Sequence, residues 1–275
     1  MCQGAPSVSH LLFADDSLIL CRANGSDALQ LQSILDMYEE GSGQKINRDK
    51  SAVLFSPNTS TECREEVMQA LNIQRETMNE KYLGLPVFVG HNRKKVFSYL
   101  KDRVWARIQG WKEKMLSRAG KEILIKVVAQ AIPTFAMGCF DITKELCDEM
   151  SSMICRYWWS CQDNEKKMHW INWKKLTEPK EEGGLGFRDI HAFNLAMLAK
   201  QGWRLAQNPK SLCARILKAK YYPNGDVLKA RAGNNPSYTW RSILKGIEVL
   251  NRGIIWRVGN GRSINIWRDP WLSWL

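Results

Sequence analysis

The sequence predicts an α+β fold, in which a few antiparallel strands with one packed helix precede a mostly helical region and a C-terminal β-hairpin. Three observations support this prediction. Apolar runs flank a polar pair in residues 10–21 (HLLFADDSLILC), as in a tight strand–turn–strand hairpin. From Arg93 onward, apolar residues recur at helical spacing. Near the C-terminus, Gly259-Asn260-Gly261 separates two apolar segments, and Asn-Gly between alternating strands favours a hairpin.

The segments between this first hairpin and Arg93 have mixed patterns. Helices are expected at residues 27–40 and 61–72, a short strand at 51–55 and an extended piece at 82–87. In the first of these helices Asp27 is the expected N-cap, and Gly41 with Gly43 is expected to end the helix.

Helical patterns dominate the rest of the chain. They cover residues 93–108, 121–132, 143–159, 190–206 and 210–220. A polar, turn-rich stretch that ends in Gly183-Gly184-Leu185-Gly186 is the best candidate boundary. We therefore expect three domains, at residues 1–90, 91–182 and 183–275.

The chain is strongly basic, with a net charge of +12 over 275 residues. Residues 1–60 have a net charge of −3, so the remainder sums to +15. This concentration of positive charge after residue 60 indicates an anionic partner, of which nucleic acid is the leading candidate. The alternative is a basic surface that is merely solvated. No apolar run approaches the roughly 20 residues that span a bilayer, and no secretory segment opens the chain. We expect an intracellular protein, of the nucleus or cytoplasm, without a membrane partner.

The eight cysteines include no C-x-x-C pair. The closest two, Cys155 and Cys161, precede His169, but zinc ligand pairs usually lie closer together in sequence. Buried or unused thiols are therefore the preferred interpretation, with zinc binding as the alternative.

The adjacent carboxylates Asp15 and Asp16 are the candidate catalytic residues. Mg²⁺ prefers carboxylate oxygens, and nucleotidyl transfer uses two such ions about 3.5–4 Å apart. A turn between two apolar strands is a rigid place from which to present both side chains, and the small Ala14 would let a primer end approach. The alternative interpretation is an ordinary hairpin with an acidic turn.

The hairpin sequence resembles the F-A-D-D motif of reverse transcriptases from LINE-like, non-LTR retrotransposons, especially those of plants. Further family motifs are matched in order along nearly the whole chain. They are Gly41-Ser42-Gly43-Gln44-Lys45-Ile46-Asn47 with Lys50-Ser51, Tyr82-Leu83-Gly84-Leu85-Pro86, Leu116-Ser117 with Ala119-Gly120-Lys121, Gly183-Gly184-Leu185-Gly186, and Trp256-Arg257-Val258-Gly259-Asn260-Gly261.

This resemblance implies an RNA-directed DNA polymerase: a partial palm, a helical thumb-like region and a connection region. It implies Asp15 as a Mg²⁺ ligand, with Asp16 as a neighbour that tunes the site. Lys50 occupies a motif position from which related polymerases supply a proton to leaving pyrophosphate, with a surface lysine after a turn as the alternative. The implied partners are an RNA/DNA template–primer duplex and dNTPs.

Residues 93–130 have eleven Lys and Arg against three Asp and Glu, a net charge of +8. Thumb helices grip duplex phosphates with such cations without reading the base sequence. The predicted nucleic-acid-binding residues are Lys101, Arg103, Arg107, Lys112, Lys114, Arg118, Lys121 and Lys126.

The family's polymerase core also needs a metal-binding Asp on a strand well upstream of the hairpin, and fingers that hold the template. The nine residues before the hairpin are too short for these parts. We therefore expect a catalytically incomplete fragment, with a non-specific nucleic-acid-binding module or an inert retroelement remnant as the alternatives.

Overall fold

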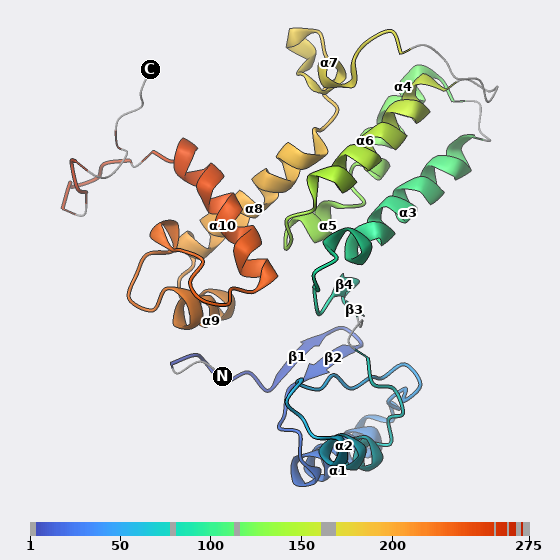
Figure 1. Ribbon diagram of the computed structural model, residues 1–275, viewed down its shortest axis with the longest axis vertical. Coiled ribbons are helices and arrows are strands. Elements are labelled where there is room, and N and C mark those ends of the chain that lie inside the picture. Colours follow the sequence, from blue (N-terminus) through green and yellow to red (C-terminus); the bar gives the residue numbers. More distant parts are fainter. Residues whose placement is uncertain are drawn as a thin grey trace. The chain divides into compact units, whose positions relative to one another are not determined.

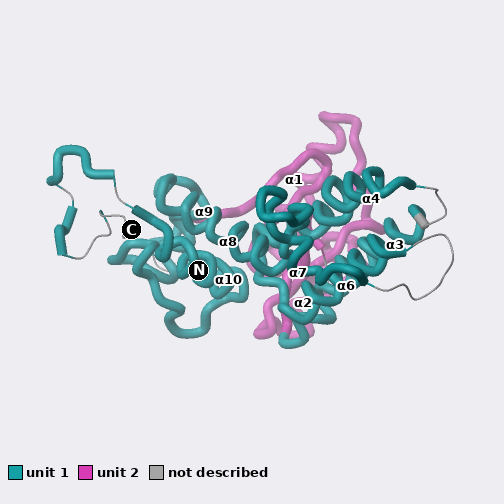
Figure 2. Tube along the Cα trace, turned by 90° about the horizontal axis from the view of Figure 1, so that it is seen from above, with its two compact units in different colours: residues 1–6, 91–275 teal, residues 7–90 magenta. Residues whose placement is uncertain are grey.

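The computed structural model describes residues 4–77, 81–112, 116–160, 169–255, 257–262, 264–267 and 271. Helices accompany two small antiparallel sheets, which confirms the predicted α+β class (Figure 1). The chain divides into two compact units, residues 7–90 and residues 1–6 with 91–275, which Figure 2 colours separately. The division that we predicted near residue 182 stays a prediction.

The smaller unit opens with the predicted hairpin. Strand β1 (His10–Phe13) pairs antiparallel with β2 (Asp16–Ile19), and two residues form the turn between them. This sheet has two strands within the part of the chain that the structure describes. Leu12 and Phe13 are 67% and 62% exposed, so these two apolar flanks of the motif lie at the surface rather than inside a larger sheet.

Two helices follow the hairpin in the sequence and pack against each other. They are α1 (Gly25–Ser42) and α2 (Thr61–Leu71). The predicted N-cap of α1 is wrong. The cap is Asn24, whose backbone is extended and whose side-chain oxygen accepts from the backbone N–H of Asp27 at 2.7 Å. Asp27 lies in the first turn, where the positive end of the helix dipole stabilises a carboxylate. The core of this unit is small and consists of Ala28, Phe55, Val67 and Leu71.

Little regular sheet follows α1. The strand predicted at residues 51–55 is only a single parallel bridge between Val53 and Glu76, at which the Val53 N–H donates to the carbonyl oxygen of Arg75 and the Val53 carbonyl oxygen accepts the N–H of Thr77. The extended piece predicted at residues 82–87 is a miniature hairpin of β3 (Lys81–Tyr82) and β4 (Leu85–Pro86). Both residues of its turn have positive φ, as tight hairpin turns require.

The larger unit is helical in its described part. Its elements are α3 (Arg93–Lys112), α4 (Arg118–Leu124), the π-helical turn η1 (Ile125–Ala129), α5 (Thr134–Met137), α6 (Lys144–Trp159), α7 (Trp173–Thr177), η2 (Lys180–Glu182), α8 (Ile190–Gln207), α9 (Leu212–Tyr221), η3 (Val227–Lys229) and α10 (Tyr238–Gly253). The helix predicted at residues 121–132 thus begins earlier, after the N-cap Ser117, and changes to π-helical geometry before Pro133. We predicted no helix at the position of α10.

Helices α3 and α6 pack side by side and form much of the core. On α3 the buried side chains are Phe97, Leu100, Val104 and Ile108, which share one helical face. On α6 the buried face includes Leu146, Met150 and Ile154. None of the helices in the described part of the chain combines the length and apolar composition that crossing a bilayer requires.

Helices α8 and α10 cross at very close range. A Cβ placed on Gly246 of α10 would lie 2.2 Å from the backbone carbon of Leu198 in α8. A Cβ on Gly202 of α8 would in turn lie 2.7 Å from Cγ1 of Ile247. Glycine at both positions lets the two backbones approach each other.

The C-terminal β-hairpin that we predicted is not formed by the described residues. Residues 257–262 contain the expected turn, with Gly261 at φ +72°, but no strand is found among residues 254–255, 257–258 and 264–267. Trp267 is 94% exposed and Ile266 is 66% exposed. An isolated two-stranded hairpin is marginal in water without a packed face, which explains why the turn signal alone was misleading.

Candidate functional site

The Asp-Asp turn lies at the tip of the β1–β2 hairpin. Ala14 has φ +50°, a left-handed conformation that favours glycine, and it makes the chain reverse within two residues. The backbone N–H of Leu20 donates to the carbonyl oxygen of Ser9 at 2.7 Å, so the hairpin pairing continues beyond the strands. Asp16 lies opposite Phe13 at the last pair before the turn. Backbone pairing of the two strands, from the Phe13–Asp16 pair to the Ser9–Leu20 bond, therefore fixes the turn.

Asp15 and Asp16 are both exposed. Neither side chain has a hydrogen bond or ion pair among the residues that the structure describes, so both carboxylates are available to a cation. Mg²⁺ commonly binds one or two protein carboxylates and completes its shell with water and phosphate oxygens. The pair fits that limited role. It does not fit a complete two-metal centre, because no group of three potential metal ligands exists in the described part of the chain.

Lys50 is exposed and follows a turn at Asn47, whose side-chain oxygen accepts the Lys50 backbone N–H at 3.0 Å. Among the described residues, no hydrogen bond or ion pair joins the Lys50 side chain to Asp15 or Asp16. Its predicted role as a proton donor stays a prediction.

Several of the predicted nucleic-acid-binding cations are bound within the chain. Lys101 Nζ lies 2.9 Å from Glu149 Oε2, and Lys126 Nζ lies 2.7 Å from Glu122 Oε1. The hydrogen bonds from Lys126 and Lys180 lower the pKa of the Glu122 carboxyl.

Two more of these cations contact the end of α6. Arg118 donates to the carbonyl oxygen of Trp158 at 3.1 Å and lies 5.3 Å from the ring centres of Trp158 and Trp159. Lys121 donates to the carbonyl oxygen of Ser160. Trp158 and Trp159 are themselves buried, so these two side chains pack within the protein.

The remaining predicted cations lie along α3. Arg103 and Arg107 are exposed, and Arg103 lies 5.3 Å from the ring centre of Tyr99. The side chain of Lys112 and all of Lys114 fall outside the described residues. The nucleic-acid interface at these positions stays a prediction.

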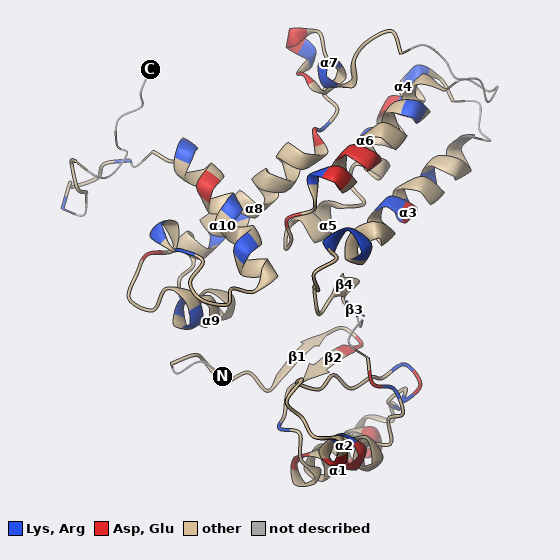
Figure 3. Ribbon diagram, viewed as in Figure 1, with Lys and Arg blue, Asp and Glu red and all other residues tan. Residues whose placement is uncertain are grey.

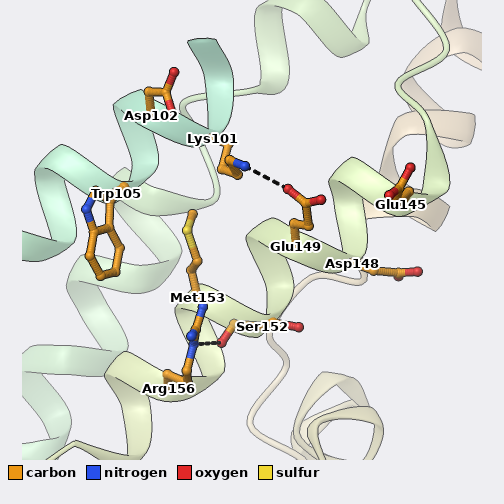
Figure 4. A pocket seen from close by; sticks show the side chains of 9 residues that line it. All are labelled: Lys101, Asp102, Trp105, Glu145, Asp148, Glu149, Ser152, Met153 and Arg156. Carbon is orange, nitrogen blue, oxygen red and sulfur yellow. Dashed lines mark hydrogen bonds and ion pairs between the residues drawn. The ribbon is translucent and has the colours of Figure 1, made fainter. Parts of the chain in front are cut away.

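An acidic row on α6 engages two of the α3 cations, Lys94 and Lys101 (Figure 3). Lys94 Nζ lies 2.5 Å from Glu145 Oε1 and 2.7 Å from Glu149 Oε1. The hydrogen bonds that Glu149 accepts from Lys94 and Lys101 lower the pKa of its carboxyl group. Figure 4 shows Lys101 directed at Glu149 across the groove between the two helices. This open groove has a volume of about 820 Å³ and is lined by Lys101, Asp102, Trp105, Glu145, Asp148, Glu149, Ser152, Met153 and Arg156.

A second basic region escaped the prediction of binding residues. It comprises α9, η3 and α10, which pack around Trp240. Two signals in the sequence could have located helix α10. They are Ser237, which caps it, and the helical spacing of Trp240, Ile243 and Ile247.

The cysteine and histidine that we considered as zinc ligands do approach each other. Cys155 Sγ lies 3.7 Å from His169 Nδ1, and burial raises the pKa of the Cys155 thiol. Cys161 lies outside the described residues. The contact is explained by packing, because His169 also stacks on Trp159 with a centroid distance of 6.0 Å.

Comparisons with known proteins extend these observations. No family model matches the chain. It is 42% identical over 143 residues to the uncharacterized mitochondrial protein AtMg00310 of Arabidopsis thaliana, an alignment that covers 52% of this chain and 93% of that protein. It is 34% identical over 193 residues to the putative ribonuclease H protein At1g65750 of the same plant, with 69% of this chain and 31% of that protein covered. This chain therefore spans about a third of the second relative. Relatives of these kinds are typical of plant retrotransposon-derived sequences.

Proposed function

We propose that this chain, which belongs to the family of the Arabidopsis thaliana mitochondrial protein AtMg00310, is a transposon-related polypeptide derived from the C-terminal part of a non-LTR reverse transcriptase. In this proposal the chain binds nucleic acid without sequence preference and cannot by itself copy a template. The ordered series of motifs from Phe13-Ala14-Asp15-Asp16 onward supports the polymerase ancestry.

One observation carries the proposal: Asp15 and Asp16 are exposed at a tight hairpin turn and have no partner among the described side chains. Two carboxylates turned into solvent repel each other and gain nothing from intrachain pairing, which suits a site that meets a cation and phosphate.

The same turn also limits the chemistry. In-line phosphoryl transfer by two metal ions requires carboxylates on separate strands that clamp both ions. Here both carboxylates come from one turn, so a further ligand from another polypeptide segment is needed. Mg²⁺ would bind at Asp15 with Asp16 beside it, and it would supply charge neutralisation for phosphate oxygens.

Primer extension tests the proposal directly. The complete chain is incubated with Mg²⁺, dNTPs and a labelled DNA primer on an RNA template, beside an Asp15→Asn variant. Binding of the same duplex is measured by fluorescence anisotropy. We expect binding without extension in both proteins. Template-dependent synthesis that the Asp15→Asn substitution abolishes would show that the site is already complete, and failure of the folded chain to bind any duplex would overturn the nucleic-acid role.

The exposed apolar side chains of the smaller unit favour one alternative, an inert remnant that folds poorly. Leu12, Phe13, Ile34 and Met37 are each at least 60% exposed. An uncovered two-stranded sheet with apolar faces promotes edge-to-edge aggregation. Sedimentation of the purified chain distinguishes the two cases, because a remnant would aggregate whereas the proposed binding protein remains dispersed.

A further inference from the structure

The second basic region, residues 210–262, has a higher net charge than the first basic region, residues 93–130. Residues 210–262 have eleven Lys and Arg against only two Asp and Glu, a net charge of +9. All eleven cationic residues are exposed. They are Lys210, Arg215, Lys218, Lys220, Lys229, Arg231, Arg241, Lys245, Arg252, Arg257 and Arg262.

The two basic regions differ in how far their charge is neutralised inside the chain. Ion pairs with α6 hold Lys94 and Lys101 of the first region. In the second region Lys245 pairs with Asp141. Arg215, Lys218 and Arg252 have no ion-pair partner within the described part of the chain. A cation without an intrachain partner keeps its full attraction for an external phosphate.

These cations are displayed on a rigid frame. Tyr221 at the end of α9 stacks on Trp240 of α10, with ring centroids 4.8 Å apart and an interplanar angle of 2°. The Tyr221 hydroxyl also accepts the backbone N–H of Ser237 at 3.0 Å. The end of α9, which carries Lys218 and Lys220, is thereby fixed beside the start of α10.

The segment around η3 is attached to the same helix. Asn251 of α10 donates to the carbonyl oxygen of Leu228 at 2.9 Å, and the Trp240 indole N–H donates to the carbonyl oxygen of Arg231 at 3.4 Å. The backbone of residues 228–231 thus lies against α10 at both ends. The end of α9 and the segment at η3 are therefore both held against α10, and all three elements carry exposed cations.

Helix α10 itself has a basic stripe. Arg241, Lys245 and Arg252 fall on one exposed face at spacings of four and seven residues, with Glu248 between the last two. Figure 3 shows Lys and Arg on both α9 and α10. The opposite face of α10 is buried through Trp240, Ile243 and Ile247, so the stripe cannot turn inward.

We propose that the exposed surface of α9, η3 and α10 is the face that contacts the phosphate backbone of a bound nucleic-acid duplex, in preference to the ion-paired face of α3. The inference rests on the nucleic-acid binding proposed above and names its surface. Each phosphate neutralised by a Lys or Arg releases condensed counterions. The logarithm of the affinity therefore falls with the logarithm of salt concentration by about 0.9 per contact on duplex DNA.

A pair of charge-matched variants tests this assignment. The first combines Arg215→Gln, Lys218→Gln and Arg252→Gln, and the second combines Lys94→Gln, Lys101→Gln and Lys175→Gln. Lys175 is ion-paired with Glu178, so every cation of the second variant has an intrachain partner. Both variants lose three positive charges, so the net charge of the chain is the same in the two proteins.

Binding to a labelled duplex DNA and to an RNA–DNA hybrid is measured by anisotropy over a salt series. Circular dichroism confirms that each variant is folded. We expect the first variant to flatten the salt slope by about two to three and the second to leave it close to wild type. Equal slopes in both variants would mean that total charge governs binding and would overturn the inference, as would a larger effect of the second. If the wild-type chain binds neither duplex, the proposed function fails first.

Discussion

The side-chain oxygen of Asn194 accepts the backbone N–H of Ile142 at 2.8 Å, in the interior of the larger unit. The amide nitrogen of the same side chain donates to the carbonyl oxygens of Met137 and Phe140, at 3.0 and 2.9 Å. One fully buried amide on α8 thus satisfies three backbone groups at the end of α5 and in the loop that leads to α6. Buried backbone groups are costly to leave unpaired, so this residue fixes how the loop sits on α8.

Asn194→Ala is therefore expected to destabilise the larger unit by about 3 kcal/mol or more, because three buried backbone groups lose their partner. Urea unfolding followed by tryptophan fluorescence measures the change. Asn251→Ala is the matched control, since the exposed Asn251 makes one bond to Leu228 and its loss costs about 1 kcal/mol or less. Equal effects of the two substitutions would contradict this account.

Gly246→Ala is expected to destabilise the crossing of α8 and α10. The new Cβ would meet the backbone of Leu198 at 2.2 Å and of Ala199 at 2.4 Å, and backbone cannot rotate away as a side chain can. We expect a loss of about 2–3 kcal/mol, in the range for overpacked sites. Gly110→Ala on α3 is the control, because its Cβ has open space and alanine favours helix by up to about 1 kcal/mol. A neutral Gly246→Ala would show that the helices can separate freely.

Alkaline pH is expected to weaken the contact between α10 and the loop at Asp141. Burial, and secondly the charge of Asp141, raise the pKa of Tyr238 to about 12, from its ordinary value of 10.0. The folded state therefore favours the neutral phenol, whose hydroxyl donates to the carbonyl oxygen of Asp141. This stabilisation is complete below pH 10 and is lost as the pH rises toward 12.

The urea midpoint measured at several pH values between 9 and 12 tests this expectation, with Tyr238→Phe as the comparison. The phenylalanine variant starts less stable, because it lacks the hydroxyl bond to Asp141, but its alkaline decline should be shallower. An identical decline in both proteins would assign the pH dependence to other groups.

Removal of divalent cations is expected to leave nucleic-acid binding intact. The proposed interface consists of Lys and Arg side chains, which need no metal to attract phosphate. Addition of EDTA to the anisotropy assay at constant ionic strength should change the dissociation constant less than twofold. A large loss of affinity would move the interface to the Asp15–Asp16 turn.

Features that depend on neighbouring residues were predictable from the sequence. The β1–β2 hairpin follows from the alternation around Asp15, and α6 follows from Leu146, Met150 and Ile154 at intervals of four. The position of the carboxylate pair was predictable for the same reason, since its two members are adjacent.

Helix α10 was missed for a physical reason. Two of its buried positions, Ser242 and Gly246, are residues that disfavour a helix in sequence, although Trp240, Ile243 and Ile247 lie at helical spacing. The neutralisation of Lys94 by Glu145 was also invisible, because 51 residues separate the two. The C-terminal turn shows the reverse error, in which a local signal at Asn260 has no packed strands to support it among the described residues.

Ala14 provides a direct test of the turn that presents the two carboxylates. Its φ of +50° costs an L-residue about 1–2 kcal/mol, whereas glycine adopts this conformation freely but loses about 0.5–1 kcal/mol in chain entropy on folding. Ala14→Gly should therefore stabilise the hairpin by about 0.5–1 kcal/mol, which slows hydrogen exchange of the Leu20 amide by roughly two- to fivefold. Gly84→Ala provides the reverse control, because Gly84 has φ +76° in the turn between β3 and β4 and should lose protection there. Faster exchange at Leu20 in the Ala14→Gly protein would show that the turn is not strained, and that the carboxylates are held by something other than this backbone geometry.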